Sequence, residues 1–356
     1  MAKKHNVLIL GASYGSLLGT KLAMGGHNST MVCLPAEVEA FNTDGARVRM
    51  PIKGRQDLVE IDSRKLSGKL GAAGPAAVDP ANFDLVVLAM QEPQYRSAGV
   101  RELTEKVAKS GKPCMSIMNM PPLPYLKRIK GLDHDKLRPC FADAAVWDAF
   151  DPKNMTLCSP DPQAFRPPDE KVNVLQVRLP TNFKSARFES DAHTAILRDL
   201  ERDVDAARIE VEGKVIECPV KLKVHESVFV PLAKWAMLIA GNYRCVGRDG
   251  MRSIKDAVHT DLAATKAVYE YVVKLCVSFG ADPGDLVPFE KYANAALSLD
   301  SPSSAARALA AGAPNIERVD LLVKSIGAQK GMKLDSLDET VGLVEGWLAK
   351  NRAAKA

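Results

Sequence analysis

The sequence has no closely spaced cysteine pair and no metal-binding motif. Its seven cysteines lie far apart, at positions 33, 114, 140, 158, 218, 245 and 276, and His134 and His193 have no partner at a ligand spacing. These spacings exclude a C-x-x-C redox motif and a zinc-finger site, so we expect no metal. Dispersed, unpaired cysteines are typical of a reducing compartment, and we therefore expect a cytoplasmic protein.

Long apolar runs and basic clusters are also missing. No run of about 18 apolar residues could span a membrane, and the apolar run near the N-terminus is too short for a signal peptide. The net charge is only +5, with lysines and arginines scattered among acids. This pattern argues against a nucleic-acid or membrane partner and is compatible with a small anionic ligand.

The opening stretch has the pattern of a nucleotide-binding unit. An apolar run over residues 7–10 ends at Gly11, helical apolar spacing follows from about Gly15, and a second apolar run covers residues 30–34. Strand, glycine turn, helix and strand in about thirty residues form the first unit of dinucleotide-binding folds. There, N–H groups at the helix N-terminus receive a pyrophosphate.

The glycine fingerprint of this turn is incomplete. Gly11, Ala12, Ser13, Tyr14 and Gly15 are one residue short of G-x-G-x-x-G. The missing second glycine normally lets the backbone approach the phosphates, and the small Ala12 or Ser13 also leaves room. We predict that these five residues bind a cofactor. The alternative is an ordinary strand-to-helix turn whose glycines serve packing alone.

Two further apolar runs end in residues that can reach a ligand. Residues 83–90 lead to Met90 and Gln91, and residues 114–118 lead to Asn119. Ligands of open α/β sheets bind beyond the carboxyl ends of the strands, so we expect these three residues at the cofactor. The Asn119 amide suits a nicotinamide carboxamide or a substrate oxygen; a cap of the following turn is the alternative.

The end of the second strand bears on cofactor choice. An acid there binds the 2′-hydroxyl of NAD, whereas basic residues accommodate the phosphate of NADP. Leu34 and Pro35 are neither, and four basic residues follow in a predicted hairpin: Arg47, Arg49, Lys53 and Arg55. We therefore expect NADP rather than NAD, although a solvated hairpin face explains the same residues.

The remaining pattern predicts two domains of different class. Helices are expected over 35–44, 100–110 and 192–207, strands over 137–147, 155–158, 171–179 and 208–218, and a loose connection over 67–82. Later, helical stretches dominate: 230–246, 253–279, 302–311, 316–327 and 336–350. We predict an α/β chain with a Rossmann-like dinucleotide-binding domain, residues 1–222, and an all-helical substrate and dimerisation domain, residues 223–356.

One apolar helix carries two polar residues. Lys234 and Asn242 are eight residues apart in PLAKWAMLIAGNYRCV, which places them on roughly the same side of a helix. A lysine beside Trp235 and Leu238 is expected to be partly desolvated, and desolvation makes an ammonium a better proton donor near neutral pH. The alternative is a lysine that extends to the surface.

Two later helix starts carry further candidates. Ser303 and Ser304 lie where a helix begins, and they can cap it or hold a carboxylate. Glu317 begins the next helix and is available for a role in a site. We expect Asp320 and Lys324, four residues apart, to form a solvated pair.

Together these features resemble the ketopantoate reductase family along most of the chain. The resemblance rests on GSLLG opening the first helix, an asparagine closing a later strand, an apolar helix with K-x7-N, and a serine pair before a glutamate-bearing helix. It implies reduction of a 2-oxo acid by NADPH, and a helical domain related to that of 6-phosphogluconate dehydrogenase.

The resemblance also implies a role for each candidate. Lys234 matches the lysine that protonates the carbonyl oxygen, and Glu317 matches the acid that orients substrate and lysine. Asn242 matches the asparagine that holds the substrate hydroxyl, and Asn119 matches the asparagine at the nicotinamide. Ser303 or Ser304 matches the serine that binds the substrate carboxylate.

The sequence departs from the family pattern in several places. Gln91 stands where the family has a lysine, Leu238 takes the middle place of K-x3-N-x3-N, and residues 150–225 add length. Losing a cation and an amide is expected to change the substrate more than the hydride chemistry. We therefore expect a homodimeric NAD(P)H-dependent reductase of a small carboxylate-bearing carbonyl, with ketopantoate as one candidate.

Two other functions are open. An opine-type dehydrogenase joins an amino acid and a 2-oxo acid through an imine, commonly with a histidine in the helical domain, and His225 and His259 are available. A non-catalytic NADP-binding sensor would explain the altered glycine fingerprint.

Overall fold

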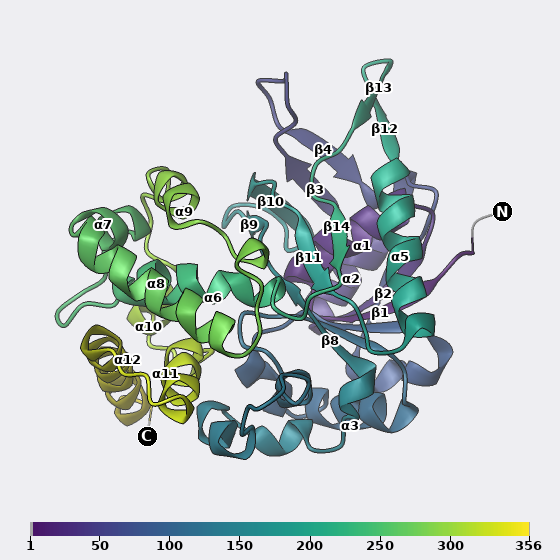
Figure 1. Cartoon of the computed structure of the whole chain (residues 1–356). Helices are drawn as coiled ribbons and strands as arrows, with labels where there is room; N and C mark the ends of the chain where they lie inside the picture. The colour runs from purple at the N-terminus through teal and green to yellow at the C-terminus, as the bar shows by residue number, and fades with distance from the viewer. Residues whose placement is uncertain (1–2, 356) are drawn as a thin grey trace. The chain divides into compact units, whose positions relative to one another are not determined.

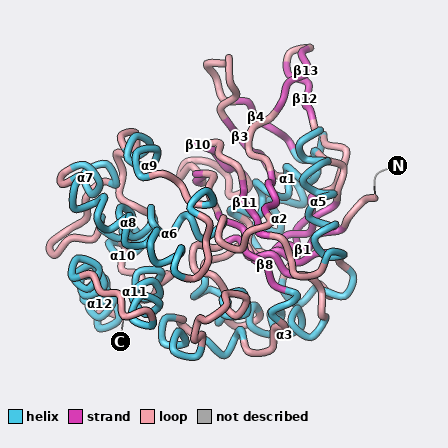
Figure 2. The backbone as a smooth tube through the Cα atoms, in the orientation of Figure 1, coloured by secondary structure: helices cyan, strands magenta, loops and turns pink. Residues whose placement is uncertain are grey.

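The computed structural model describes residues 3–355, which divide into two compact units (Figures 1 and 2). The first contains the residues up to Met90, Gln94–Tyr125 and Val146–Glu226; the second contains Gln91–Pro93, Leu126–Ala145 and the chain from Ser227 onward. Within these described residues every strand lies in the first unit, and the second unit is helical. The predicted α/β class, Rossmann-like and then helical, is confirmed. The functional roles assigned to domains 1–222 and 223–356 stay predictions.

The main sheet of the first unit has eight strands in the order β14-β11-β8-β7-β6-β1-β2-β5. Their bounds are β1 Asn6–Leu10, β2 Asn28–Val32, β5 Leu70–Ala73, β6 Leu85–Leu88, β7 Cys114–Ile117, β8 Met155–Ser159, β11 Phe183–Ala186 and β14 Leu222–His225. All neighbouring pairs are parallel except β8 with β11. Strand order reverses beside β1, which has β2 on one side and β6 on the other; open α/β sheets bind ligands at such a point.

A second sheet and a separate hairpin complete the strands of this unit (Figure 2). The second sheet has the order β4-β3-β10-β9, with bounds β3 Arg47–Met50, β4 Val59–Asp62, β9 Gln163–Phe165 and β10 Val174–Leu179. The predicted hairpin of β3 and β4 is confirmed by their antiparallel pairing. The single strand expected over 208–218 is wrong: β12 Arg208–Val211 and β13 Lys214–Glu217 form a hairpin, because Glu212 and Gly213 both turn the chain with positive φ.

Two other local expectations are also wrong. Residues 137–147 contain the 3₁₀ turns η5 Asp135–Cys140 and η6 Ala144–Trp147 instead of a strand, and Pro139 has no N–H for a sheet ladder. The presumed loose connection over 67–82 contains β5, which pairs in parallel with β2. Its small residues give a weak strand signal, so the pairing partner decides its conformation.

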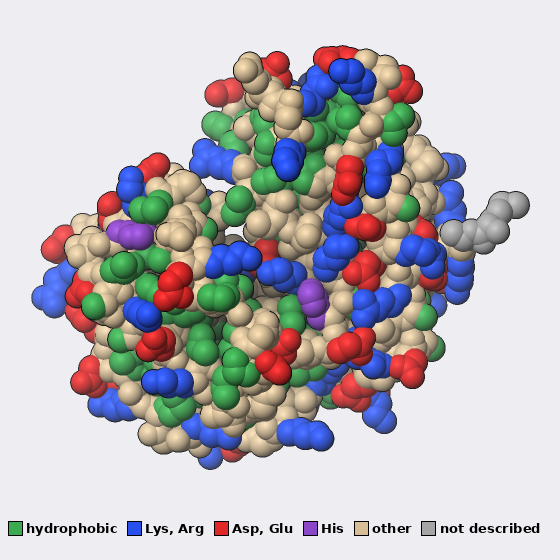
Figure 3. Space-filling view, turned by 45° about the horizontal axis from the view of Figure 1, so that its top comes forward, with side chains coloured by type: hydrophobic (Ala, Val, Ile, Leu, Met, Phe, Trp, Pro, Cys, Tyr) green, Lys and Arg blue, Asp and Glu red, His purple; other side chains and the backbone are tan. Residues whose placement is uncertain are grey.

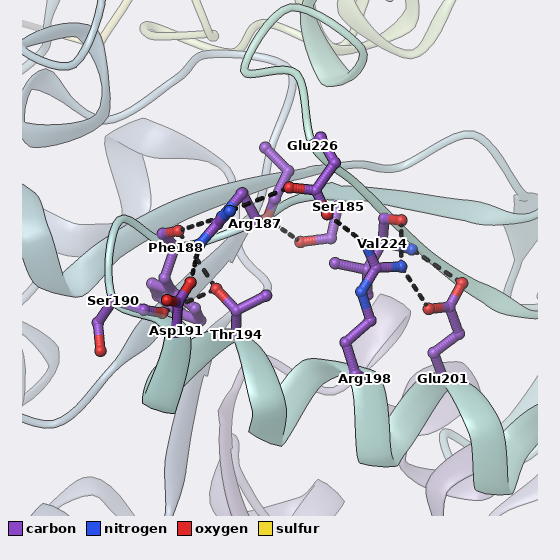
Figure 4. Close-up of polar contacts among 11 residues, drawn as sticks. Ser185, Arg187, Phe188, Ser190, Asp191, Thr194, Arg198, Glu201, Val224 and Glu226 are labelled. Carbon is purple, nitrogen blue, oxygen red and sulfur yellow. Dashed lines mark hydrogen bonds and ion pairs between the residues drawn. The ribbon is translucent and has the colours of Figure 1, made fainter.

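Four helices of ten or more residues pack in the first unit: α1 Ser13–Met24, α2 Pro35–Asp44, α3 Val100–Ser110 and α5 Asp191–Ala206 (Figure 1). A single turn, α4 Leu123–Leu126, lies at the point where the chain leaves this unit. Helix α5 covers the edge strand β14 (Figure 4). The carbonyl of Val224 in β14 accepts from Arg198 Nη1 at 2.7 Å, and its N–H donates to Glu201 Oε1 at 3.1 Å. Glu226 pairs with Arg198 at 2.7 Å and Arg187 at 3.0 Å. Side chains of α5 thus bond Val224, so this part of the edge is not open to another strand.

Two buried histidines lie at the start of the sheet. His5 and His27 are each 1% exposed. The His5 N–H donates to His27 Nδ1 at 3.2 Å, and His27 Nε2 lies 3.3 Å from Asp203 Oδ2 in α5. Because Nδ1 accepts, His27 is neutral with its proton on Nε2. Burial lowers the pKa of His27, which also favours the neutral form.

We expect acidification from about pH 7.5 to about pH 5.5 to destabilise the protein through His27. Its pKa in the folded chain is below the unfolded value, so the unfolded chain binds more protons in this range. The free energy of unfolding then falls by at most about 1.4 kcal/mol per pH unit for this group. Urea unfolding at several pH values measures the slope. His27→Gln, whose amide can make both contacts, should flatten it; an unchanged slope would contradict the assignment.

The second unit is built from helices of uneven length. They are α6 Lys234–Met237, α7 Ile254–His259, α8 Leu262–Ser278, α9 Phe289–Ala296, α10 Ser304–Ala310, α11 Val319–Gln329 and α12 Asp335–Ala353. The helix expected over 253–279 divides because Asp261 caps a new helix, accepting from the Ala264 N–H at 2.9 Å. No helix in residues 3–355 is long and apolar enough to cross a membrane. On the face drawn in Figure 3, Lys and Arg lie among Asp and Glu rather than in one basic patch.

Candidate active site

Gly11 follows β1 directly, at the point where the strand order reverses. Its φ is 109°, and a Cβ there would lie 2.6 Å from Met90 Cγ and 2.7 Å from the Ala89 carbonyl oxygen. Only glycine fits this close approach of the two strand ends. The fully buried Tyr95, which the sequence analysis did not single out, fixes the chain after β6. Its hydroxyl accepts a hydrogen bond from the Met90 N–H at 3.1 Å.

Helix α1 begins at Ser13, two residues earlier than expected. A Cβ on Gly15 would lie 2.9 Å from Ile9 Cγ2, so this glycine lets the helix pack on β1. Ala12 is buried and Ser13 is exposed at the helix start. The first N–H groups of a helix have no partner within it and can receive an anion.

Asn119 lies two residues after β7, at the same edge of the sheet as Gly11. Its Oδ1 is buried and has no hydrogen-bond partner among residues 3–355. A buried acceptor without a donor is costly, so a ligand donor there would be favourable. This oxygen is therefore not used to cap the following turn.

Lys234 and Asn242 lie in one interrupted helix instead of the continuous helix expected over 230–246. Helix α6 passes into a π-helical turn, Leu238–Asn242, and then a 3₁₀ turn, Tyr243–Cys245. Eight residues of regular α-helix advance about 80° beyond two turns. A π-turn holds more residues per turn, which brings Asn242 back toward the side of Lys234. Both are half-buried, whereas Leu238 between them is 3% exposed.

Glu317 is 7% exposed and is held by two residues that the sequence did not single out. The Tyr243 hydroxyl donates to the Glu317 carbonyl and accepts from the Val319 N–H at 3.1 Å. Burial raises the pKa of Tyr243 well above its usual value, so this hydroxyl keeps its proton. The Glu92 N–H faces Glu317 Oε1 at 3.4 Å, and the buried Glu92 carboxylate accepts from the Ala142 N–H at 3.2 Å.

The solvated pair expected between Asp320 and Lys324 is wrong. Asp320 is 0% exposed, and its two oxygens accept from Arg318 Nε and Nη2 at 3.0 Å each. Lys324 instead pairs with Asp338 of α12 at 2.9 Å. Four-residue spacing favours a pair only where both residues share an exposed helix face, and Asp320 points into the unit. The buried pair fixes the start of α11 beside Glu317.

The two serines have different environments. Ser303 Oγ accepts from the Ala306 N–H at 3.2 Å and donates to the Asn242 carbonyl at 2.7 Å, so it caps α10 and joins it to the interrupted helix. Ser303 is buried and Ser304 is exposed. Of the two hydroxyls, that of Ser304 is the one open to a ligand.

The structure gathers the candidates in two sets, one in each unit. The first unit holds residues 11–15, Met90 and Asn119 along one sheet edge; the second holds the predicted catalytic and substrate-binding groups, Lys234, Asn242, Ser303, Ser304 and Glu317, with Gln91 beside Glu92. His259 bonds the Ala293 carbonyl at 2.9 Å and His225 belongs to β14. In residues 3–355, no three or more His, Cys, Asp or Glu side chains gather as metal ligands would.

Solved structures with the same fold cover nearly the whole chain. A 2-dehydropantoate 2-reductase from Methylococcus capsulatus superposes with a TM-score of 0.65 at 13% identity, covering 97% of each chain. D-mandelate dehydrogenase, solved with NADH and anilino(oxo)acetate, gives 0.63 at 12% identity, covering 98% of this chain and 99% of its own.

A ketopantoate reductase from Staphylococcus aureus, described as dimeric, gives a TM-score of 0.59 at 9% identity, with 97% and 99% coverage. No protein-family model and no curated protein matches the sequence. At these identities the likeness establishes the fold. The resemblance to ketopantoate reductases expected from the sequence is thus confirmed in the fold.

Proposed function

We propose that this chain, which has the fold of ketopantoate reductases, is an NAD(P)H-dependent reductase of a small 2-oxo acid. The observation that carries the proposal is the buried Asn119 Oδ1 without a partner among residues 3–355, at the sheet edge where the Gly11 turn lies. The carboxamide of a nicotinamide offers a donor of the matching kind. When bound, a reduced nicotinamide supplies a hydride. The residues that would hold it are Gly11, Ala12, Ser13, Tyr14, Gly15, Met90, Gln91 and Asn119.

The second unit supplies the other groups that carbonyl reduction needs. Lys234 gives a proton to the substrate oxygen as negative charge develops there. Asn242 holds that oxygen, and Ser304 or Ser303 binds the substrate carboxylate. Glu317 orients the substrate and Lys234, and its own place is fixed through Tyr243 and Glu92. Prepositioned groups of this kind lower the barrier by holding reactants in one geometry.

The assembly and location belong to the same proposal. We propose a homodimer, in keeping with the dimeric ketopantoate reductase that shares the fold, and a cytoplasmic location, in keeping with seven free cysteines. Neither His225 nor His259 supports an opine-type reaction, because the first lies in a strand of the other unit and the second bonds a backbone carbonyl.

Cofactor titration followed by turnover assays tests this function. Fluorescence titration with NADH and with NADPH is followed by cofactor oxidation against a panel of 2-oxo acids that includes ketopantoate. We expect binding of at least one cofactor and oxidation with at least one 2-oxo acid. Binding without turnover on any panel member would favour a nucleotide sensor. Failure to bind either cofactor would refute the assignment of residues 11–15.

A further inference from the structure

A carboxylate lies at the carboxyl end of β2, although no acid directly follows that strand in the sequence. Leu34 comes two residues after β2, and its N–H donates to Glu37 Oε2 at 2.9 Å. Glu37, in the first turn of α2, therefore folds back onto the strand end. In dinucleotide-binding folds, an acid about 20 residues after the glycine turn meets the ribose 2′-hydroxyl. Glu37 lies at about this spacing from Gly15, and its carboxylate lies at the end of β2, where the ribose is expected.

Arg166 holds this carboxylate from a distant part of the chain. Arg166 Nη1 forms an ion pair with Glu37 Oε1, and both side chains are partly buried. Arg166 directly follows β9. Nearby, the Tyr14 hydroxyl of α1 donates to the Pro162 carbonyl at 3.0 Å. Residues 162–166 thus contact the first turns of both α1 and α2.

The arginines expected to receive the phosphate of NADP are engaged with acids elsewhere. Three of them form ion pairs on the second sheet or its neighbouring hairpin: Arg47 with Asp62 at 3.2 Å, Arg49 with Glu60 at 2.8 Å, and Arg55 with Glu212 at 2.7 Å. Their charge is balanced by these acids. These ion pairs engage three of the four basic residues of the hairpin, and they weaken the argument for NADP that the sequence provided.

We infer that Glu37, held in place by Arg166, makes this chain select NADH over NADPH; the inference rests on the proposed function. The carboxylate can accept a hydrogen bond from a ribose 2′-hydroxyl. A 2′-phosphate is a dianion, and it would meet the like-charged Glu37 carboxylate, with which Arg166 Nη1 is already paired. Arg166 acts as a positioning residue, since it keeps Glu37 turned toward the strand end. This preference is the reverse of the one expected from the sequence.

The variant Glu37→Gln tests the inference without removing the helix cap. A glutamine side chain at this position of a capping box can also accept the hydrogen bond from the Leu34 N–H. Helix α2 therefore keeps its first turn while the negative charge of residue 37 is lost. We expect the native chain to bind NADH at least tenfold more tightly than NADPH. In Glu37→Gln that ratio should fall at least tenfold, mainly through tighter NADPH binding. Fluorescence titration of the full chain with each cofactor measures both dissociation constants.

Two further variants separate specificity from folding. Asp261→Asn removes a capping carboxylate from α8 in the other unit and should leave the NADH to NADPH ratio within twofold. Arg166→Gln should weaken NADH binding severalfold, because Glu37 loses the ion pair that holds its carboxylate at the end of β2. The thermal midpoint of this variant is measured in parallel to detect any loss of folding. A native preference for NADPH, or an unchanged ratio in Glu37→Gln, overturns the inference alone. Absence of binding by either cofactor overturns the inference together with the proposed function.

Discussion

Replacing Lys234 by methionine is expected to lower the turnover number of carbonyl reduction by about 10²- to 10⁴-fold, the range over which general acid catalysis contributes. Methionine keeps the unbranched apolar stem and suits a helix, but it cannot donate a proton. Lys234 is half-buried at the start of the interrupted helix, and its neighbours Trp235 and Leu238 are buried. The dissociation constant for the cofactor should stay within about threefold of the native value, because Lys234 belongs to the second unit and the glycine turn, residues 11–15, belongs to the first.

The measurement is cofactor oxidation under saturating substrate, paired with fluorescence titration of the same preparation. Lys274→Met is the matched control, since Lys274 is an exposed lysine on α8 of the same unit. Lys234→Arg keeps the positive charge with a group that does not release its proton at neutral pH, and should remain nearly inactive. Turnover of Lys234→Met within tenfold of the native rate would rule out Lys234 as the proton donor.

Asp320→Ala is expected to reduce the free energy of unfolding by about 3–5 kcal/mol, the cost of removing one member of a buried ion pair. Asp320 is completely buried, and its two oxygens accept from Arg318 at 3.0 Å each. Burial raises the pKa of Asp320, and the Arg318 guanidinium offsets part of that cost. Without Asp320, the acidic partner that remains to the guanidinium among residues 3–355 is Glu345, at 2.6 Å.

Urea unfolding of the full chain measures this loss, with Asp338→Ala as the control. Asp338 pairs with Lys324 at 2.9 Å in a partly exposed position, where a salt bridge contributes about 0–1 kcal/mol. Activity at a temperature where Asp320→Ala stays folded should also fall, because Arg318 and Asp320 lie directly beyond Glu317. An equal decrease in the free energy of unfolding in Asp320→Ala and Asp338→Ala would contradict a larger contribution from the buried pair of Arg318 and Asp320.

The local pattern was sufficient for the framework of the fold. Gly11 after a short apolar run, and helical apolar spacing after it, indicated the strand, turn and helix of a dinucleotide-binding unit. Helix α2 and helix α3 have the bounds that the sequence predicted. Such features depend on residues within one or two turns of each other, so their spacing along the chain carries the information.

Where spacing misled, a partner distant in the sequence decided the outcome. β5 has few strand-forming residues, yet it pairs with β2, and residues 208–218 turn back at Glu212 into a hairpin. The polar contacts of Glu317 with Glu92 join residues more than two hundred positions apart. No local pattern encodes such pairings, because they form only when packing brings the segments together.

The candidate site divides in the same way. The sequence by itself determined which residue types stand at the strand ends and helix starts, among them Asn119, Lys234 and Glu317. Only the tertiary structure decided that Asp320 is buried against Arg318 and that Glu37 folds back to the end of β2 under Arg166. The physical reason is that a charged side chain takes the partner nearest in space, and burial makes that choice costly to reverse.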